Sequence, residues 1–218
     1  MFLHQHPYPP FIPPNTKKLI IGTIPPPRFS TGKLFEEDVD FCYGSKHNFL
    51  WKILSNIFDE NFEYSNTQKA VDQRKAFLTQ KQIGICDMVE SCEREKMNAS
   101  DLGMKNIKLR DLINILKKTP TIETIFFMGG NSKNSPEYFF RKHLNDSKLK
   151  LEPAENNSPK INQFILDIRV IKTISLISPS AAANRSIGAN PLYKELKKQN
   201  SSFTTFDFRV MLYKKYFF

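Results

Sequence analysis

The sequence predicts a single-domain, three-layer α/β/α fold with a mostly parallel central sheet. Segments with the pattern of buried strands alternate with segments of helical apolar spacing, and this alternation favours parallel strands covered by helices on both faces. A length of 218 residues suffices for one domain with a full core. The content of 40% hydrophobic and 25% charged residues is typical of an ordinary soluble globular protein.

The chain opens with a proline-rich arm, predicted over residues 1–18, and residues 19–218 form the α/β domain. The arm is expected to be extended and to lie on the domain. It contains His4 and His6, which could be a metal-binding pair; because no cysteine or carboxylate lies near them in the sequence, we expect them to be ordinary surface residues instead. The first domain element is a buried strand over Leu19–Ile24, an apolar run that ends in a Gly/Pro turn.

The remaining elements follow from apolar spacing and capping residues. Helices are predicted over Asn48–Phe58, Thr67–Gln80 (capped by Thr67), Leu109–Lys118, Pro136–Leu144 (capped by Ser135), from Pro191 (capped by Asn190), and over Phe206–Phe217. Strands are predicted over Ile83–Cys86, Ile122–Met128, Ile161–Ile168 and Arg169–Ile177. The polar segment Asn145–Lys160 is expected to be a surface excursion.

Charge and cysteine content narrow the class of function. The net charge of +10 favours a polyanionic partner, with nucleic acid first and an anionic membrane second, although a general basic bias would give the same value. No apolar run is long enough for a membrane helix, and the first residues lack a signal-peptide pattern. Cys42, Cys86 and Cys92 are odd in number and widely spaced, which favours a reducing, cytoplasmic location.

Ligands of parallel sheets bind beyond the carboxyl ends of the strands. This rule selects four segments: Gly22–Pro26, Cys86–Val89, Met128–Asn131 and Ser178–Ala183. Between the first two lies a loop that contains Phe41-Cys42-Tyr43-Gly44 and then Asn48-Phe49-Leu50-Trp51. A backbone turn, a flat ring and one amide side chain can together form a pocket for a small planar ligand.

This combination resembles the uracil-DNA glycosylase superfamily. It is most similar to the mismatch-specific and hypoxanthine-DNA branches, which carry a Gly-X-X-Pro turn and a later Tyr-Gly/Ala…Asn-X-X-Trp segment. By this resemblance the substrate-binding turn is Gly22, Thr23, Ile24 and Pro25. The best-known branches place a water-orienting Asp or Asn where this chain has Ile24, whereas the hypoxanthine-DNA branch shares the departure.

The resemblance assigns the catalytic role to Asn48. A neutral amide cannot act as a general base, but it can hold a water beneath an oxocarbenium-like sugar. The alternative is that Asn48 is only a helix N-cap, a role that asparagine fills well. Tyr43 or Phe41, next to Gly44, is a stacking surface for an extruded base, with core packing as the alternative for Phe41. His47 is a further candidate.

Two other segments are expected to contact the base. Asp87 follows a strand and begins a stretch that resembles an acidic strand end followed by Ser-Cys-X-Arg; a turn-capping role is the alternative. Superfamily members usually place a base-reading Asn after the strand that ends here at Met128. In this chain Gly129, Gly130 and Asn131 occupy that region, so exposed backbone groups or Asn131 would read the base.

The last segment resembles the superfamily's X-Pro-Ser turn and DNA-wedging loop. Ser178 stands where family members often have His, and its hydroxyl can donate a weaker hydrogen bond to the leaving base. Ser180, Ala182, Asn184 and Arg185 are the expected DNA-contacting residues. A Ser/Ala-rich surface turn without function is the alternative.

Taken together, the resemblance implies a monofunctional DNA glycosylase that removes hypoxanthine or uracil from DNA, acts as a monomer and needs no metal or organic cofactor. No lysine is placed for lyase chemistry. Two alternatives remain: a DNA-binding protein on a degenerate glycosylase scaffold, favoured by Ile24 and Ser178, and a hydrolase of free nucleosides or nucleotides, disfavoured by the net charge.

Overall fold

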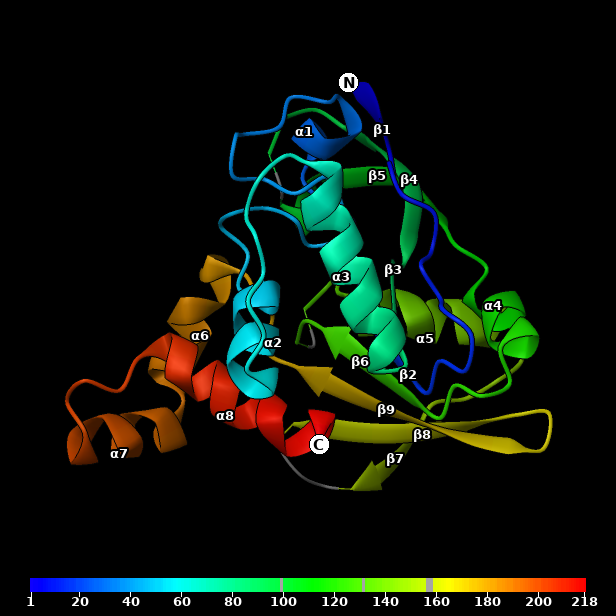
Figure 1. Ribbon diagram of the computed structural model, residues 1–218. Helices are drawn as coiled ribbons and strands as arrows, with labels where there is room; N and C mark the ends of the chain where they lie inside the picture. Colours follow the sequence, from blue (N-terminus) through cyan, green and yellow to red (C-terminus); the bar gives the residue numbers. More distant parts are fainter. Residues whose placement is uncertain (99, 131, 156–158) are drawn as a thin grey trace.

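The computed structural model of the protein describes residues 1–98, 100–130, 132–155 and 159–218. Its centre is a sheet with the strand order β3-β2-β6-β9-β8-β7 (Figure 1). The strands are β2 (Lys18–Gly22), β3 (Ile83–Asp87), β6 (Thr124–Met128), β7 (Glu152–Glu155), β8 (Lys160–Leu166) and β9 (Arg169–Leu176). The first four in spatial order are parallel, and β8 and β7 continue the sheet antiparallel. The predicted α/β class is therefore confirmed.

Helices cover both faces of this sheet because its strands are apolar on both sides. Along β2, Ile20 points into one core, whereas Leu19 and Ile21 point into the other. The first core is closed by α2 (Leu50–Phe58), α3 (Gln68–Gln80) and α8 (Thr205–Phe217). The second is closed by α4 (Leu112–Lys118) and α5 (Pro136–Asp146). Figure 1 shows these helices as the two outer layers.

A second, three-stranded antiparallel sheet was not predicted. Its strands are β1 (Phe2–Gln5), β4 (Val89–Arg94) and β5 (Met104–Leu109), in the order β1-β4-β5. The expectation that His4 and His6 lie on the surface is wrong, since they are 0% and 9% exposed. Pairing of β1 with β4 carries them inward, where the His4 ring accepts a hydrogen bond from Arg94 at 2.8 Å.

Most element boundaries agree with the sequence expectations. The side chains of Thr67, Ser135 and Asn190 cap α3, α5 and α7 (Pro191–Gln199), as predicted. Helix α4 begins at Leu112 rather than Leu109, because Leu109 ends β5 and Asp111 caps the helix. The segment expected to be a surface excursion contains the end of α5 and the exposed edge strand β7.

The short remaining elements lie in connections: α1 (Pro27–Ser30), η1 (Asp101–Gly103), η2 (Ala181–Ala183) and α6 (Asn184–Ala189). Among the described residues, none of the helices combines the length and the apolar character needed to cross a membrane.

Candidate active site

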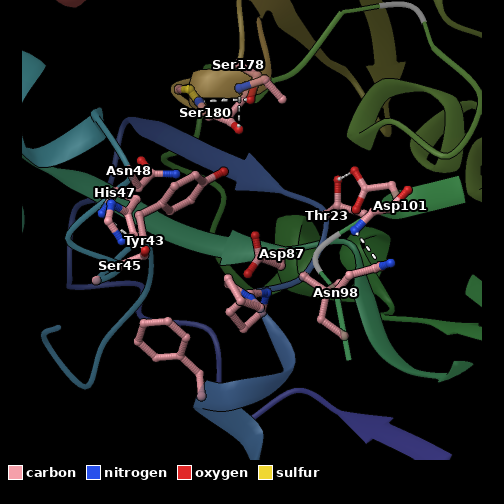
Figure 2. A pocket seen from close by; sticks show the side chains of 18 of the residues that line it. Thr23, Tyr43, Ser45, His47, Asn48, Asp87, Asn98, Asp101, Ser178 and Ser180 are labelled. Atoms are coloured by element: carbon pink, nitrogen blue, oxygen red, sulfur yellow. Dashed lines mark hydrogen bonds between the residues drawn. The ribbon is translucent and has the colours of Figure 1, made fainter. Parts of the chain in front are cut away.

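A cavity of about 760 Å³ lies at the carboxyl ends of the parallel strands. This is the edge at which parallel sheets bind ligands. Its walls come from the turn after β2, the loop before α2, the end of β3, the loop that leads into η1, and the segment after β9. In Figure 2, Asn48 and Tyr43 lie on one side of it, Thr23 and Asp101 on the other, and Asp87 between them.

Backbone hydrogen bonds hold these walls together. The N–H groups of Met88 and Val89 donate to the carbonyl oxygens of Gly22 and Thr23, at 2.9 and 3.0 Å. The Phe49 N–H, at the start of α2, donates to the Pro179 carbonyl at 2.8 Å. Segments that are remote in sequence are thus fixed relative to one another.

The floor of the cavity is packed tightly over Gly22. A Cβ atom on this residue would lie 2.1 Å from Asp87 Oδ1 and 2.2 Å from Tyr43 Oη. Both distances are far below van der Waals contact, so any larger residue here would displace the Asp87 and Tyr43 side chains. Gly22, which the sequence predicts as part of a ligand-binding turn, therefore also leaves the space that the Asp87 and Tyr43 side chains occupy.

Asp87 is held by a histidine from the N-terminal arm. The His6 Nε2 atom lies 2.7 Å from Asp87 Oδ2, and the other ring nitrogen accepts the Tyr8 N–H at 3.0 Å. Because Nδ1 is an acceptor, the neutral ring carries its proton on Nε2 and donates it to Asp87. One carboxylate oxygen of Asp87 is therefore fixed while the side chain lines the cavity.

Tyr43 has an unusual backbone conformation. Its φ of 56° lies in the left-handed region, which costs a bulky residue about 1 kcal/mol or more. The next residue must be glycine, because a Cβ on Gly44 would lie 1.8 Å from the Val39 carbonyl oxygen. Burial, and then the charge of Asp87, raise the pKa of Tyr43 well above its usual range. The neutral hydroxyl is buried and has no hydrogen-bond partner among the described residues.

The loop that carries Tyr43 and Asn48 is anchored by an ion pair. Arg28 donates two hydrogen bonds to the buried Asp38 carboxylate, at 2.8 and 3.0 Å, and a third to Ser45. Burial alone would oppose ionisation, but the bonds from Arg28 and from backbone N–H groups hold the pKa of Asp38 below its usual value. The loop thus has a fixed conformation beside the cavity.

Asn48 lies two residues before the first residue of α2, whose N-cap position is Phe49. Its Oδ1 accepts the Leu50 N–H at 2.9 Å, which fixes the orientation of the amide. The residue also lines the cavity, and its Nδ2 has no partner in the described part of the chain. The second lone pair of Oδ1 remains available to a water molecule.

The segment after β9 is organised by a fully buried arginine. Arg209 of α8 donates to the carbonyl oxygens of Ser178 and Ser180, at 3.0 and 2.8 Å, and to Asn184 Oδ1 at 2.9 Å. Ser178 Oγ accepts the Ser180 N–H at 3.2 Å, so the Ser178 hydroxyl proton is available to a ligand. Arg209 is a residue that the sequence analysis did not assign to the site.

A second carboxylate that the sequence analysis missed, Asp101, also lines the cavity. The Thr23 hydroxyl donates to its Oδ2 at 3.1 Å. Burial raises the pKa of Asp101 to about 6; the Thr23 bond and the charge of Arg94 oppose this shift, and Asp87 adds to it. Nothing in the local sequence marks this aspartate, because its partner Thr23 is 78 residues away.

The predicted site residues differ in their position relative to the cavity. Those that line the cavity are Thr23, Ile24, Pro25, Tyr43, Gly44, His47, Asn48, Asp87, Ser178, Ser180 and Ala182. Gly22 lies beneath it. Phe41 packs in the core against Trp51, and Met128 rather than Gly129 or Gly130 reaches the cavity. Asn131 lies outside the described residues. Asn184 is bound to Arg209 and Thr205, and Arg185 is exposed beyond the cavity lining.

Comparisons with known proteins agree with this architecture. No protein-family model matches the chain. It is 26% identical over 131 residues to a hypoxanthine DNA glycosylase from Methanosarcina barkeri, a match that covers 60% of this chain and 73% of that protein. Its fold is similar to the solution NMR structure of a candidate uracil DNA glycosylase from Methanosarcina acetivorans, with a TM-score of 0.55 and 18% identity over 95% of this chain and 99% of the other.

The resemblance to the uracil-DNA glycosylase superfamily is confirmed. The points at which the chain departs from the motifs of the uracil-DNA glycosylase superfamily, Ile24 and Ser178, both line the cavity. Polar groups from other segments, among them Asn48, Asp87 and Asp101, line it as well. Within the described residues, no three His, Cys, Asp or Glu side chains gather in a way that could hold a metal ion.

Proposed function

We propose that this protein is a monofunctional DNA glycosylase that hydrolyses the N-glycosidic bond of a deaminated base, hypoxanthine or uracil, in DNA. The observation that carries the proposal is the cavity at the carboxyl edge of the parallel sheet, which is lined by Tyr43, Asn48, Asp87 and Ser178. Sequence similarity to a hypoxanthine DNA glycosylase supports the reaction class. The enzyme would act as a cytoplasmic monomer and leave an abasic site.

The proposed mechanism starts with an extruded base that stacks on the ring of Tyr43. The backbone of Gly22, Thr23, Ile24 and Pro25, with Gly44, would frame the base. The Ser178 hydroxyl would donate a hydrogen bond to the departing base. Asn48 would accept a hydrogen bond from the attacking water through its second lone pair and hold it near the sugar carbon.

Contacts to the rest of the DNA are proposed for residues around the cavity. Ser180 and Ala182 line its rim, and the exposed Arg185 is suited to a phosphate. Base reading by Gly129, Gly130 or Asn131 remains a proposal from the resemblance; of the described residues at this strand end, Met128 lines the cavity. Asn184, bound by Arg209, would act by shaping the loop.

The experiment is single-turnover excision on duplexes that carry one hypoxanthine, one uracil or no modified base, read out by alkaline strand cleavage. We expect Asn48→Ala to slow excision by roughly 10²-fold or more, a barrier increase of about 2.7 kcal/mol. Asn190→Ala is the matched control, because the Asn190 Oδ1 also accepts the N–H two residues further on, but Asn190 lies outside the cavity. Its expected effect is a loss of about 1 kcal/mol of stability with unchanged excision.

A non-catalytic DNA-binding protein is the second candidate, favoured by Ile24 in the water-orienting position. It predicts tight binding to damaged duplexes with no excision by the unmodified protein. If Asn48→Ala instead behaves like Asn190→Ala, the catalytic role of Asn48 is refuted while the glycosylase assignment stands.

A further inference from the structure

Asp101 reaches the cavity from a segment that carries none of the superfamily motifs. It opens η1, in the connection between β4 and β5. Two contacts fix it: the Thr23 hydroxyl donates to its side chain at 3.1 Å, and the Asn134 amide donates to its main-chain carbonyl at 2.9 Å. Thr23 belongs to the turn that frames the proposed base site, so the carboxyl group is held beside that turn.

No cation pairs with this carboxyl group in the described part of the chain. The nearest guanidinium, Arg94, directs its hydrogen bonds to His4 and to the carbonyl oxygens of Asn98 and Ser100. Asp101 Oδ1 has no hydrogen-bond partner among the described residues. Asp87 accepts its hydrogen bond from the ring of His6, at 2.7 Å, whereas Asp101 accepts its bond from the Thr23 hydroxyl, at 3.1 Å. The two carboxyl groups of one cavity therefore have different donors.

A carboxyl group that is buried without an ion pair can serve as the acid of a hydrolase. Asp101 faces three titratable or charged groups, namely Arg94, Cys92 and Asp87. Burial is the largest influence and raises its pKa to about 6, so the protonated fraction at pH 7 is about a tenth, far more than for an ordinary aspartate. Figure 2 shows Asn48 and Asp101 on opposite sides of the cavity, whose volume is about 760 Å³.

We propose that Asp101 is the catalytic residue that donates a proton to the leaving base, and that the base is a deaminated purine. This inference rests on the proposed glycosylase function. A purine presents a ring nitrogen, N7, whose lone pair accepts a proton before or as the glycosidic bond breaks. Uracil has no such nitrogen. At the position where superfamily members often have His, this chain has Ser178, whose hydroxyl is a weaker donor. A second donor is therefore needed to help the base leave.

The Asp101 carboxyl proton moves to N7, the C1′–N9 bond breaks, and the bonding pair stays with the base, which leaves as neutral hypoxanthine. The sugar is left as an oxocarbenium ion and Asp101 as a carboxylate. The water at Asn48 forms a bond to C1′ and releases one proton to solvent, and Asp101 regains a proton from solvent.

The test compares Asp101→Asn with the unmodified protein on duplexes that carry deoxyinosine or 7-deaza-2′-deoxyinosine, in which a C–H group replaces N7. We expect Asp101→Asn to slow release of hypoxanthine by roughly 10²-fold or more. The unmodified protein should lose at least this factor on the 7-deaza substrate, whose base is also the poorer leaving group, and Asp101→Asn should lose nothing further there. Excision by the unmodified protein should fall as the pH rises above about 6, and this dependence should vanish in the variant.

Asp111→Asn is the matched control, since Asp111 is an exposed aspartate at the start of α4 outside the cavity. It should leave excision and its pH dependence unchanged. If the protein releases hypoxanthine but Asp101→Asn retains the full rate, or the two substrates react alike, the inference fails and the glycosylase assignment stands. If only uracil is released, the purine assignment fails. If no base is released from any duplex, the proposed function itself fails.

Discussion

At the scale of single residues, ionisation of the buried Asp101 side chain destabilises the fold, whereas an asparagine at this position would not ionise. Its pKa is about 6 in the folded protein, against 3.8 for an ordinary aspartate. A raised carboxyl pKa means that ionisation opposes folding, so the destabilisation appears as the pH rises from about 4 to about 6 and stays constant above that. The burial that makes Asp101 a candidate acid therefore lowers the stability of the fold at neutral pH.

This gives a prediction for Asp101→Asn that does not depend on activity. The variant should be more stable than the unmodified protein by about 1–3 kcal/mol at pH 7.5, and the gain should disappear near pH 4. Urea unfolding at the two pH values measures the difference, with Asp111→Asn as the control. An equal gain at both pH values would show that the carboxyl group is not the cause.

Residues of the candidate site differ in how far the sequence could place them. The order of strands and turns brings Tyr43, Asn48 and Ser178 to one edge, since carboxyl ends of parallel strands meet there. His6 and Asp101 could not be found in this way. Their partners, Asp87 and Thr23, lie 81 and 78 residues away, and no local spacing records a contact over such a distance.

At the scale of elements, β1 is the piece of the arm that supports the site. It pairs with β4 through Phe2–Gln5. The next residue, His6, makes the hydrogen bond with Asp87. The sequence predicted an extended arm but no pairing, because β4 and β5 interleave charged residues with apolar ones. Glu93 and Lys105, for instance, face each other in this sheet, and two register shifts interrupt it. Neither strand shows the continuous apolar run that identified β2 and β6.

We predict that His6→Ala destabilises the protein by about 1–3 kcal/mol, because a buried carboxylate loses its donor. His6→Gln, which keeps an N–H group, should recover part of this loss. Guanidinium unfolding of both variants measures the effect, and His47→Ala, at an exposed position, serves as the control. Equal losses in the alanine and glutamine variants would mean that ring packing, rather than the bond to Asp87, matters.

At the scale of the whole molecule, the net charge of +10 dominates the expected behaviour toward DNA. Lysine and arginine side chains that neutralise phosphates release counterions, so affinity depends on salt. For four phosphate contacts, affinity should fall by about 10²-fold between 50 and 200 mM salt. The charge was available from the sequence, whereas the place of each contact depends on which basic side chains lie near the cavity edge.

Arg185→Ala should therefore weaken binding to damaged and undamaged duplexes alike and reduce the salt dependence by about one contact. Titration at several salt concentrations measures both quantities. Lys118→Ala is the control, since Lys118 ends α4 shortly before β6 begins and so lies toward the amino ends of the strands. An affinity that does not change with salt would contradict a DNA-binding role for the whole protein.

The bond between His6 and Asp87 also has a consequence for how the protein is made. β1 leaves the ribosome before the residues that complete its sheet and the floor of the cavity, which emerge 81 or more positions later. At a synthesis rate of about 5–20 residues per second, β1 and His6 remain without these partners for roughly 4–16 s. During that interval the nascent chain carries an unpaired strand, so the cavity can form only after Asp87 and β4 have left the ribosome.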